Sequence, residues 1–252
     1  MQKKLYDFLY REEGNHWYHC ARQDLLRVYF RQIAVEYGRK LRILDVGSGT
    51  GGMFNLLEEF GEVTGFEFSE YAAKLCRKKH PNTALRLGSA NNLSELFPAQ
   101  SFDIVTFFNV LYHQWIEDDA KVVKQAASLI RPGGYLILNE PAFKYLYRDN
   151  DKFCYGIRRY TEKEIRGILS TAGLSLDKST YFNSLCFLPV LALSYLQRYG
   201  LMKKNTISNE LNLLIGINTL LKYLMVLERI WIRVFGKMPL GVSILSIGKK
   251  PE

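Results

Sequence analysis

Apolar segments that read as strands alternate with amphipathic segments that read as helices from residue 41 to about residue 140. The strand candidates are Arg42–Val46, Glu62–Glu67, Ala84–Leu87, Asp103–Phe107 and Tyr135–Asn139. Strands joined through helices run parallel, and their sheet must be covered on both faces. The alternation therefore predicts an α/β fold with a mostly parallel central sheet, completed by strands at Lys178–Asn183 and Val242–Gly248.

The 252 residues fit one large domain. Two segments outside the alternation of strands and helices extend it. We expect residues 1–38 to form an N-terminal helical cap and residues 184–238 a helical apolar insertion, since the latter is too long for an ordinary loop. The cap helix is indicated by apolar residues at helical spacing, namely Leu26, Phe30, Ile33 and Tyr37. Residues 39–183 and 239–252 are then the core that contains the sheet.

The formal net charge of +9 favours anionic partners. Basic residues are spread along the chain and do not gather with aromatic residues, so we do not expect a nucleic acid as a partner. The cysteines lie far apart and form no CxxC pair, so neither a disulfide framework nor a metal site is expected: they are Cys20, Cys76, Cys154 and Cys186. The first residues lack the pattern of a signal peptide, so we expect a cytoplasmic protein, with the inner membrane surface as an alternative location.

A glycine-rich turn follows the first strand directly. Ile43–Val46 leads into Gly47–Gly52 and then into a helical pattern at Met53–Phe60. Glycines there let the backbone approach a ligand closely, and the spacing matches G-x-G-x-x-G, with Glu67 about twenty residues on to meet ribose hydroxyls. Asp45 shifts the balance away from a dinucleotide, because a carboxylate at this point repels a pyrophosphate and attracts an ammonium or sulfonium. S-adenosyl-L-methionine carries both cations.

Residues 43–51 resemble the first motif of the class I S-adenosylmethionine-dependent methyltransferases, which is two apolar residues, an acid, any residue and Gly-x-Gly-x-Gly. The resemblance continues to about residue 140 through Gly88–Ala90, Asn109–His113 and Leu129–Gly134. It implies a Rossmann-like fold, S-adenosyl-L-methionine as cofactor, and a Glu67 that binds both ribose hydroxyls. The implied cofactor-binding residues are Asp45, Gly47, Ser48, Gly49, Gly51, Glu67, Phe68, Ser89, Ala90, Asn91, Asn109 and Val110. Many relatives carry Asp where Ser89 stands, so the adenine contact comes from Ser89, Asn91 or backbone.

This resemblance implies in-line methyl transfer, for which the protein mainly aligns the reactants and excludes water. We expect a small-molecule or lipid-linked acceptor, with oxygen as the favoured atom. His113 is the candidate catalytic base for a hydroxyl acceptor; alternatively, it caps the cofactor or hydrogen-bonds within its own loop. Two other functions stay open: an NAD(P)-dependent oxidoreductase, and a membrane-surface module on a degenerate methyltransferase fold. The oligomeric state is not predicted.

Two groups of residues outside the motifs are candidates for the site. The first is an aromatic and basic cluster that either closes over the cofactor or packs the cap helix, namely His16, Trp17, Tyr18 and Arg22. The second is Tyr181 and Asn183, which either line the acceptor pocket or belong to the core. Both alternatives are left open by the sequence.

The insertion suggests a lipophilic acceptor. Its first part has no charge from Tyr181 to Leu196, but Pro189 interrupts it and it is too short to span a membrane. Its second part has an apolar stripe at 4-3 spacing, made of Leu213, Ile217, Leu220, Leu224, Leu227, Trp231 and Val234, with Lys222, Arg229 and Arg233 on another face. Either the stripe packs over the acceptor pocket, or it makes peripheral contact with an anionic membrane.

Overall fold

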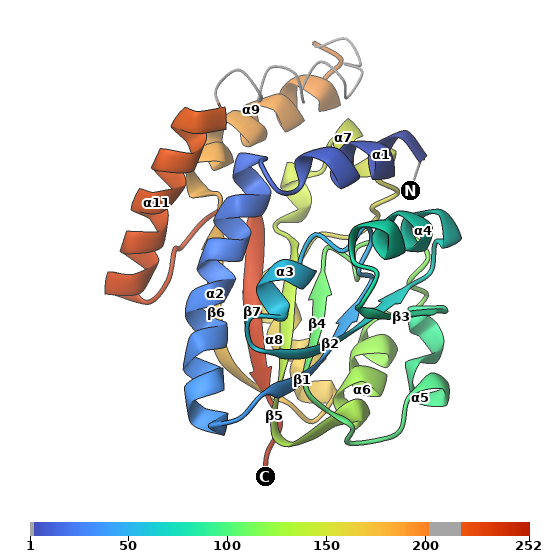
Figure 1. Cartoon of the computed structure of the whole chain (residues 1–252). Helices are drawn as coiled ribbons and strands as arrows, with labels where there is room; N and C mark the ends of the chain where they lie inside the picture. The colour runs from blue at the N-terminus through green and yellow to red at the C-terminus, as the bar shows by residue number, and fades with distance from the viewer. Residues whose placement is uncertain (1–2, 202–217) are drawn as a thin grey trace.

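The computed structural model describes residues 3–201 and 218–252, whose strands form one sheet in the order β3-β2-β1-β4-β5-β7-β6 (Figure 1). The strands are β1 (Leu41–Val46), β2 (Gly61–Glu67), β3 (Ala84–Leu87), β4 (Phe102–Phe108), β5 (Ile130–Pro141), β6 (Ser175–Phe182) and β7 (Ser243–Lys249). Strands β1 to β5 pair in parallel, and β7 runs antiparallel to both β5 and β6. The predicted α/β fold with a mostly parallel sheet is confirmed.

The chain reverses its direction of travel across the sheet at β1. It first builds outward from β1 to β2 and β3, then returns to place β4 and β5 on the other side of β1. Crossover connections diverge at such a point, which leaves a crevice at the carboxyl ends of the two central strands. Asp45 on β1 and Thr106 on β4 are register partners across this reversal.

Helices cover both faces of the sheet and the carboxyl ends of its parallel strands (Figure 1). The helices are α1 (Lys3–Glu12), α2 (Trp17–Tyr37), α3 (Phe54–Leu57), α4 (Glu70–Lys79), α5 (Leu93–Leu96), α6 (Asp119–Leu129), α7 (Asp149–Phe153), α8 (Glu162–Thr171), α9 (Phe187–Arg198) and α11 (Asn218–Phe235). One core cluster joins the sheet to α2, α3, α4 and α11, and another joins it to α5, α6 and α8. Helices α1, α7 and α9 lie above the strand ends, where they can enclose a ligand.

The fifth strand is longer than predicted. Helix α6 ends at Leu129, and β5 begins at once with Ile130, which pairs with Phe102. The segment Arg131–Gly134 therefore continues the strand where the sequence suggested only a connection to Tyr135. A side chain at Gly134 would lie 2.7 Å from the carbonyl oxygen of Asp103, so glycine lets the two strands approach.

Helix α11 packs through a different stripe from the one predicted. Its buried residues are Leu221, Met225, Glu228 and Ile232, on the side that contacts α2. The predicted stripe is mostly exposed: Leu220, Leu227, Trp231 and Val234 face outward, and Leu213 and Ile217 lie outside the described residues. Of the two alternatives for the stripe that the sequence singled out, packing over the acceptor pocket does not occur, because no described residue of α11 lines the cavity. Within the described ranges, no helix is long and apolar enough to cross a lipid bilayer.

A buried carboxylate fixes the start of β4. Asp103 accepts hydrogen bonds from both terminal nitrogens of Arg39 (2.8 Å each), from Arg131 (3.1 Å) and from the amide of Arg42 (2.8 Å). Burial alone would raise the pKa of Asp103, but the bonds from Arg39 and the Arg42 amide hold it below its ordinary value. The ionised carboxylate therefore ties β4 to the beginning of β1 and to β5.

Replacement of Asp103 by alanine should lower the free energy of unfolding by about 2–3 kcal/mol at neutral pH, because it leaves the Arg42 amide without its partner. A carboxyl group with a lowered pKa in the folded state stabilises above its unfolded pKa, and this contribution is lost as pH falls through the folded pKa. The difference between wild type and variant in urea unfolding should accordingly shrink below about pH 4. Asp177→Ala, at an exposed position of β6, is the control. Equal effects of the two changes on the free energy of unfolding would contradict the role given to Asp103.

Candidate functional site

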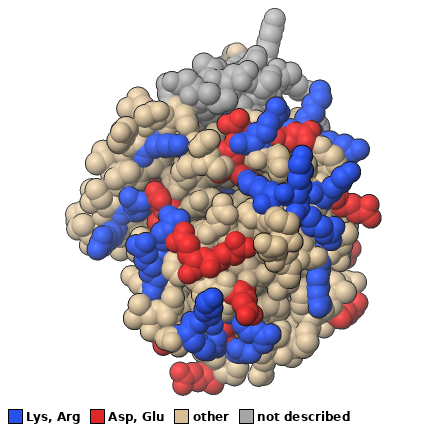
Figure 2. Space-filling view, in the orientation of Figure 1, with Lys and Arg blue, Asp and Glu red and all other residues tan. Residues whose placement is uncertain are grey.

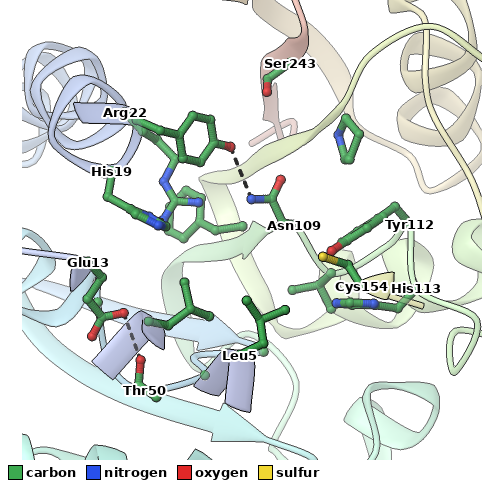
Figure 3. Close-up of a pocket in the computed structure, with 18 of the residues that line it drawn as sticks. Leu5, Glu13, His19, Arg22, Thr50, Asn109, Tyr112, His113, Cys154 and Ser243 are labelled. Atoms are coloured by element: carbon green, nitrogen blue, oxygen red, sulfur yellow. Dashed lines mark hydrogen bonds between the residues drawn. The ribbon is translucent and has the colours of Figure 1, made fainter. Parts of the chain in front are cut away.

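A cavity of about 960 Å³ opens at the carboxyl ends of β1 and β4, beneath α1 and the start of α2. This volume is near the upper end of the usual range for ligand pockets, about 300–1,000 Å³. Figure 3 shows Arg22 and His19 on one side of it, Tyr112, His113 and Cys154 on the other, and Asn109 between them. The cavity therefore has room for a cofactor and for a second molecule beside it.

Asp45 is the last residue but one of β1 and forms part of the cavity wall, with only 2% of its surface exposed. Its Oδ1 accepts a 2.6 Å hydrogen bond from the Thr106 hydroxyl, which fixes its orientation. Burial raises the pKa of Asp45 to about 7, while the Thr106 hydrogen bond and the charge of Arg22 oppose that rise. No salt bridge joins Asp45 to a basic side chain among residues 3–201 and 218–252, so the site fits a ligand that brings a positive charge.

The glycine turn after β1 needs glycine at each of its three motif positions, for different reasons. Gly47, Gly49 and Gly51 all have positive φ, which other residues rarely adopt. A side chain at Gly47 would collide with Val110, and one at Gly51 would lie 2.7 Å from the His80 ring. A side chain at Gly49 would meet only open space, because Gly49 faces the cavity. Gly51 lies outside the cavity wall, so its role is to let the turn pack against α4.

Glu67 ends β2 and holds the glycine turn in place. Its Oε2 accepts a 2.8 Å hydrogen bond from the amide of Gly49, and its Oε1 accepts a 2.8 Å bond from the amide of Ser69. Burial raises the pKa of Glu67, and the amides of Ser69 and Gly49 lower it. Each carboxylate oxygen has a second lone pair, so Glu67 can shape the turn and still accept hydrogen bonds from a bound diol.

The loops after β2 and β3 form one wall of the cavity. Phe68 is 61% exposed, and its ring centroid lies 6.4 Å from that of Trp115, so an apolar plane stands ready for a flat ligand. Ser89 and Ala90 also line the cavity. Asn91 does not line the cavity. Its side-chain nitrogen donates a hydrogen bond to the Trp115 carbonyl, and its side-chain oxygen accepts one from the Glu117 amide. The structure gives Asn91 a role in positioning that loop in place of the expected cofactor contact.

The turn after β4 is held by a carboxylate that the sequence analysis did not identify. Glu140, near the end of β5, accepts hydrogen bonds from the amides of Val110, Leu111 and Tyr112 at 3.0–3.3 Å. Burial raises its pKa to about 8, and these amides oppose the rise. The signal in the sequence is an acid at the end of an otherwise apolar strand. Asn109 enters the turn with φ of 60°, and its side chain donates a 3.2 Å bond to the Tyr18 hydroxyl.

The N-terminal cap reaches the glycine turn through its own side chains. The four cap residues singled out in the sequence all line the cavity: His16, Trp17, Tyr18 and Arg22. The guanidinium carbon of Arg22 lies 5.6 Å from the Tyr18 ring centroid and 5.5 Å from that of Phe108. Glu13, which the sequence analysis did not identify, accepts bonds from the Thr50 hydroxyl (2.8 Å) and from Lys79 (2.6 Å). The cap is therefore fastened to the turn that it covers.

His113 lies in the cavity wall beside Tyr112, with ring centroids 4.1 Å apart. Burial lowers the pKa of His113 to about 4. Its imidazole is accordingly neutral at physiological pH and can accept a proton, although it is a weak base. Its role as catalytic base stays a prediction.

The far end of the cavity is built by the insertion and by α7. Apolar side chains from α9 meet polar groups from the loops around them; the wall here includes Arg148, Cys154, Asn183, Pro189, Val190, Leu193, Val242 and Ser243. Tyr181, the other acceptor-pocket candidate, is turned away: its ring stacks on Phe143 at 4.6 Å and its hydroxyl accepts from the Glu162 amide. In the described part of the chain, no three His, Cys, Asp or Glu side chains are grouped to hold a metal ion.

Comparisons with known proteins agree with this geometry. Residues 44–138 match the model of a family described as a methyltransferase domain. A probable S-adenosylmethionine-dependent methyltransferase of Mycolicibacterium smegmatis is 29% identical over 169 residues, which are 66% of this chain and 62% of that protein. Residues 44–138 therefore belong to this methyltransferase domain family, and the chain as a whole has the fold of the class I S-adenosylmethionine-dependent methyltransferases. The methyl donor in the name of this relative is the cofactor that the sequence predicts, S-adenosyl-L-methionine.

Other relatives extend the comparison. A ubiquinone biosynthesis O-methyltransferase of Thiobacillus denitrificans is 34% identical over 113 residues, covering 42% of this chain and 47% of that protein. The chain thus spans less than two thirds of the length of these curated relatives. A solved S-adenosylmethionine-dependent methyltransferase from Archaeoglobus fulgidus has the same fold, with a TM-score of 0.57 and 18% identity over 90% of this chain and 94% of that one.

The residues of this methyltransferase fit the cofactor at several points. The buried carboxylate of Asp45 suits a cationic ligand, Glu67 suits a diol, and the open space at Gly49 admits close approach of a ligand to the backbone. In addition, the hydroxyl of Ser48 is buried in the wall and has no hydrogen-bond partner among the residues that the structure describes. These groups all come from the carboxyl ends of β1 and β2 and the glycine turn after β1, so the end of the cavity where we expect the donor is set by the reversal of the chain at β1.

Alanine at Asp45 or at Glu67 should each weaken binding of S-adenosylhomocysteine, the demethylated product of the donor, by about 1–3 kcal/mol, because a charge-assisted hydrogen bond is lost. Isothermal titration calorimetry measures this directly. Glu62→Ala, at the exposed start of β2, is the matched control and should bind like wild type. Wild-type affinity in both site variants would refute these roles.

Binding should also depend on pH through Asp45. Its pKa of about 7 means that the carboxyl group is partly protonated in the free protein, whereas a cationic ligand favours the ionised form. Affinity should therefore rise from about pH 6 to about pH 8, by up to about tenfold per pH unit below the pKa. Asp45→Asn should bind weakly with little dependence on pH. A wild-type affinity that is flat over this range would show that Asp45 does not respond to the ligand.

Proposed function

We propose that this protein transfers a methyl group from S-adenosyl-L-methionine to an oxygen atom of a lipophilic small molecule. The observation that carries the proposal is a single cavity with two chemically different ends. One end presents Asp45, Glu67 and the glycine turn, and the other presents the apolar side chains Pro189, Val190 and Leu193 of α9. A donor and an apolar acceptor can therefore lie side by side in one cavity.

Bound S-adenosyl-L-methionine would supply an activated methyl group, so the chain itself has three tasks. Asp45 and Glu67 orient the donor, with the glycine turn as the backbone surface beneath it. The cap, fastened through Glu13, closes one side of the cavity, so that water is excluded from the reacting atoms. The wall from α9 places the acceptor on the other side, in line for displacement.

Oxygen is supported as the acceptor atom by two observations. The relative from Thiobacillus denitrificans is by its name an O-methyltransferase. His113 is neutral because burial lowers its pKa to about 4, so it can accept a proton in the cavity. An oxygen that gains a methyl group before losing its proton is strongly acidic, and a weak base is then sufficient. Neither alternative function fits as well: the family assignment favours a methyl donor over a nicotinamide, and the intact acidic residues do not suggest a degenerate site.

The proposal is tested by incubating the protein with methyl-labelled S-adenosyl-L-methionine and an organic-solvent extract of bacterial cells. We expect label in the lipophilic fraction, carried on a methyl ether that mass spectrometry identifies, and no transfer by Asp45→Ala. Label that enters only protein, nucleic acid or water-soluble metabolites would contradict a lipophilic acceptor. Label on nitrogen or carbon would contradict the oxygen assignment alone.

Replacement of His113 by alanine should lower turnover on that acceptor about 100-fold, the usual contribution of a general base. The affinity for S-adenosylhomocysteine should change little, because the donor is held by other residues. His113→Gln keeps a hydrogen-bonding side chain without the basic ring and should be equally slow if proton transfer is what is lost. Turnover like that of wild type in both variants would remove His113 as the base.

A further inference from the structure

The outward face of α11 is apolar over its whole length. The helix buries Leu221, Met225 and Ile232 against the body of the protein and exposes the opposite side. The large hydrophobic residues exposed there are Leu220, Tyr223, Leu227, Ile230, Trp231, Val234 and Phe235. Figure 2 shows the corresponding region, at the upper left, as a largely uncharged surface. Scattered apolar residues on a surface need no explanation, but a continuous face such as this one marks a binding surface.

Helix α9 and the segments around it extend this surface. Their exposed hydrophobic residues are Leu185, Leu188, Tyr195, Leu196, Tyr199, Leu201 and Leu240. Together with those of α11, they make fourteen of the 21 exposed large hydrophobic residues in the described part of the chain. Exposure of apolar side chains is thus concentrated on two helices and the segments beside them, and we refer to these fourteen residues as the α9–α11 surface.

The exposed charges on the segments that form the α9–α11 surface are all positive. In the described residues 184–201 and 218–241 the one acid is Glu228, which is buried and accepts bonds from the amides of Asn183 and Ser184 at 2.6 and 2.8 Å. The basic residues in these ranges are Arg198, Lys222, Arg229, Arg233 and Lys237. Arg229 pairs with Asp24, whereas Lys222, Arg233 and Lys237 form no ion pair with any residue that the structure describes.

We propose that the α9–α11 surface docks the protein on an anionic lipid bilayer. Apolar side chains would enter the boundary between headgroups and acyl chains, with Trp231 and the tyrosines at the depth that such rings favour. The basic side chains would meet the negative headgroups. A second copy of this chain is a poorer occupant, because a symmetric interface would bring two basic surfaces together.

The position of α9 links this docking surface to the cavity. Pro189, Val190 and Leu193 line the cavity, while Leu188 and Leu196 on the same helix are exposed. A bilayer against the α9–α11 surface would therefore lie one helix away from the acceptor end. This placement would let a lipid-soluble acceptor reach the cavity from the membrane; that consequence rests on the proposed function, whereas the docking itself does not.

Vesicle flotation with the whole chain tests the docking without any use of activity. Wild type should float with vesicles of phosphatidylcholine and phosphatidylglycerol and much less with phosphatidylcholine alone, and added salt should weaken binding. The double variant Leu227→Ser with Trp231→Ser, and separately Arg233→Glu with Lys237→Glu, should each bind at least about tenfold more weakly. Val35→Ser, which removes an even more exposed apolar residue on α2, should float like wild type.

All variants should keep wild-type affinity for S-adenosylhomocysteine, which shows that they are folded. The docking proposal would be overturned if the wild-type protein did not float with anionic vesicles. It would also be overturned if the double variant of Leu227 and Trp231 floated like the wild type. A concentration-dependent dimer in sedimentation experiments that the same variant abolishes would also overturn it, because the surface would then belong to a second copy. Failure of methyl transfer with intact flotation would instead count against the proposed function alone.

Discussion

The candidate site depends on one buried carboxylate at the reversal point of the sheet. Asp45 and Thr106 face each other from neighbouring strands, and the hydrogen bond between them joins the two halves of the fold. Burial raises the pKa of Asp45 to about 7. Among the described residues, no salt bridge compensates the negative charge of its ionised form. Such a position is unfavourable for a dinucleotide phosphate and favourable for a cation, which is why it decides the class of cofactor.

The turns and the cap around Asp45 are held in place by hydrogen bonds to other carboxylates. Glu67 holds Gly49, Glu140 holds the turn after β4, and Glu13 fastens the cap to the glycine turn. These three carboxylates thus hold the glycine turn, the turn after β4 and the cap in position. None of them serves only in an exposed ion pair. A site built in this way is organised before a ligand arrives, so less ordering has to accompany binding.

Local signals in the sequence were sufficient for the sheet and the donor-binding end. Strand and helix periods, the glycine turn and the acids at the ends of the first two strands all lie within short segments, so their placement follows from the parallel sheet. The contacts of Glu13 and Glu140 were not predictable, because their partners lie about thirty or more residues away and no spacing encodes them; for Glu140 the sequence signals only an acid at the end of a strand. The packing face of α11 was not identified from the sequence for a different reason: it has the same period as the exposed stripe, and Glu228 makes it look polar. Its carboxylate is satisfied by backbone amides, which sequence alone does not show.

The most direct measurement is a crystal structure grown with S-adenosylhomocysteine and NAD present together at equal concentration. The account predicts S-adenosylhomocysteine over the glycine turn, with its ammonium toward the Asp45 side and its ribose hydroxyls on Glu67. A crevice occupied by the nicotinamide dinucleotide, or S-adenosylhomocysteine bound away from Asp45, would contradict it.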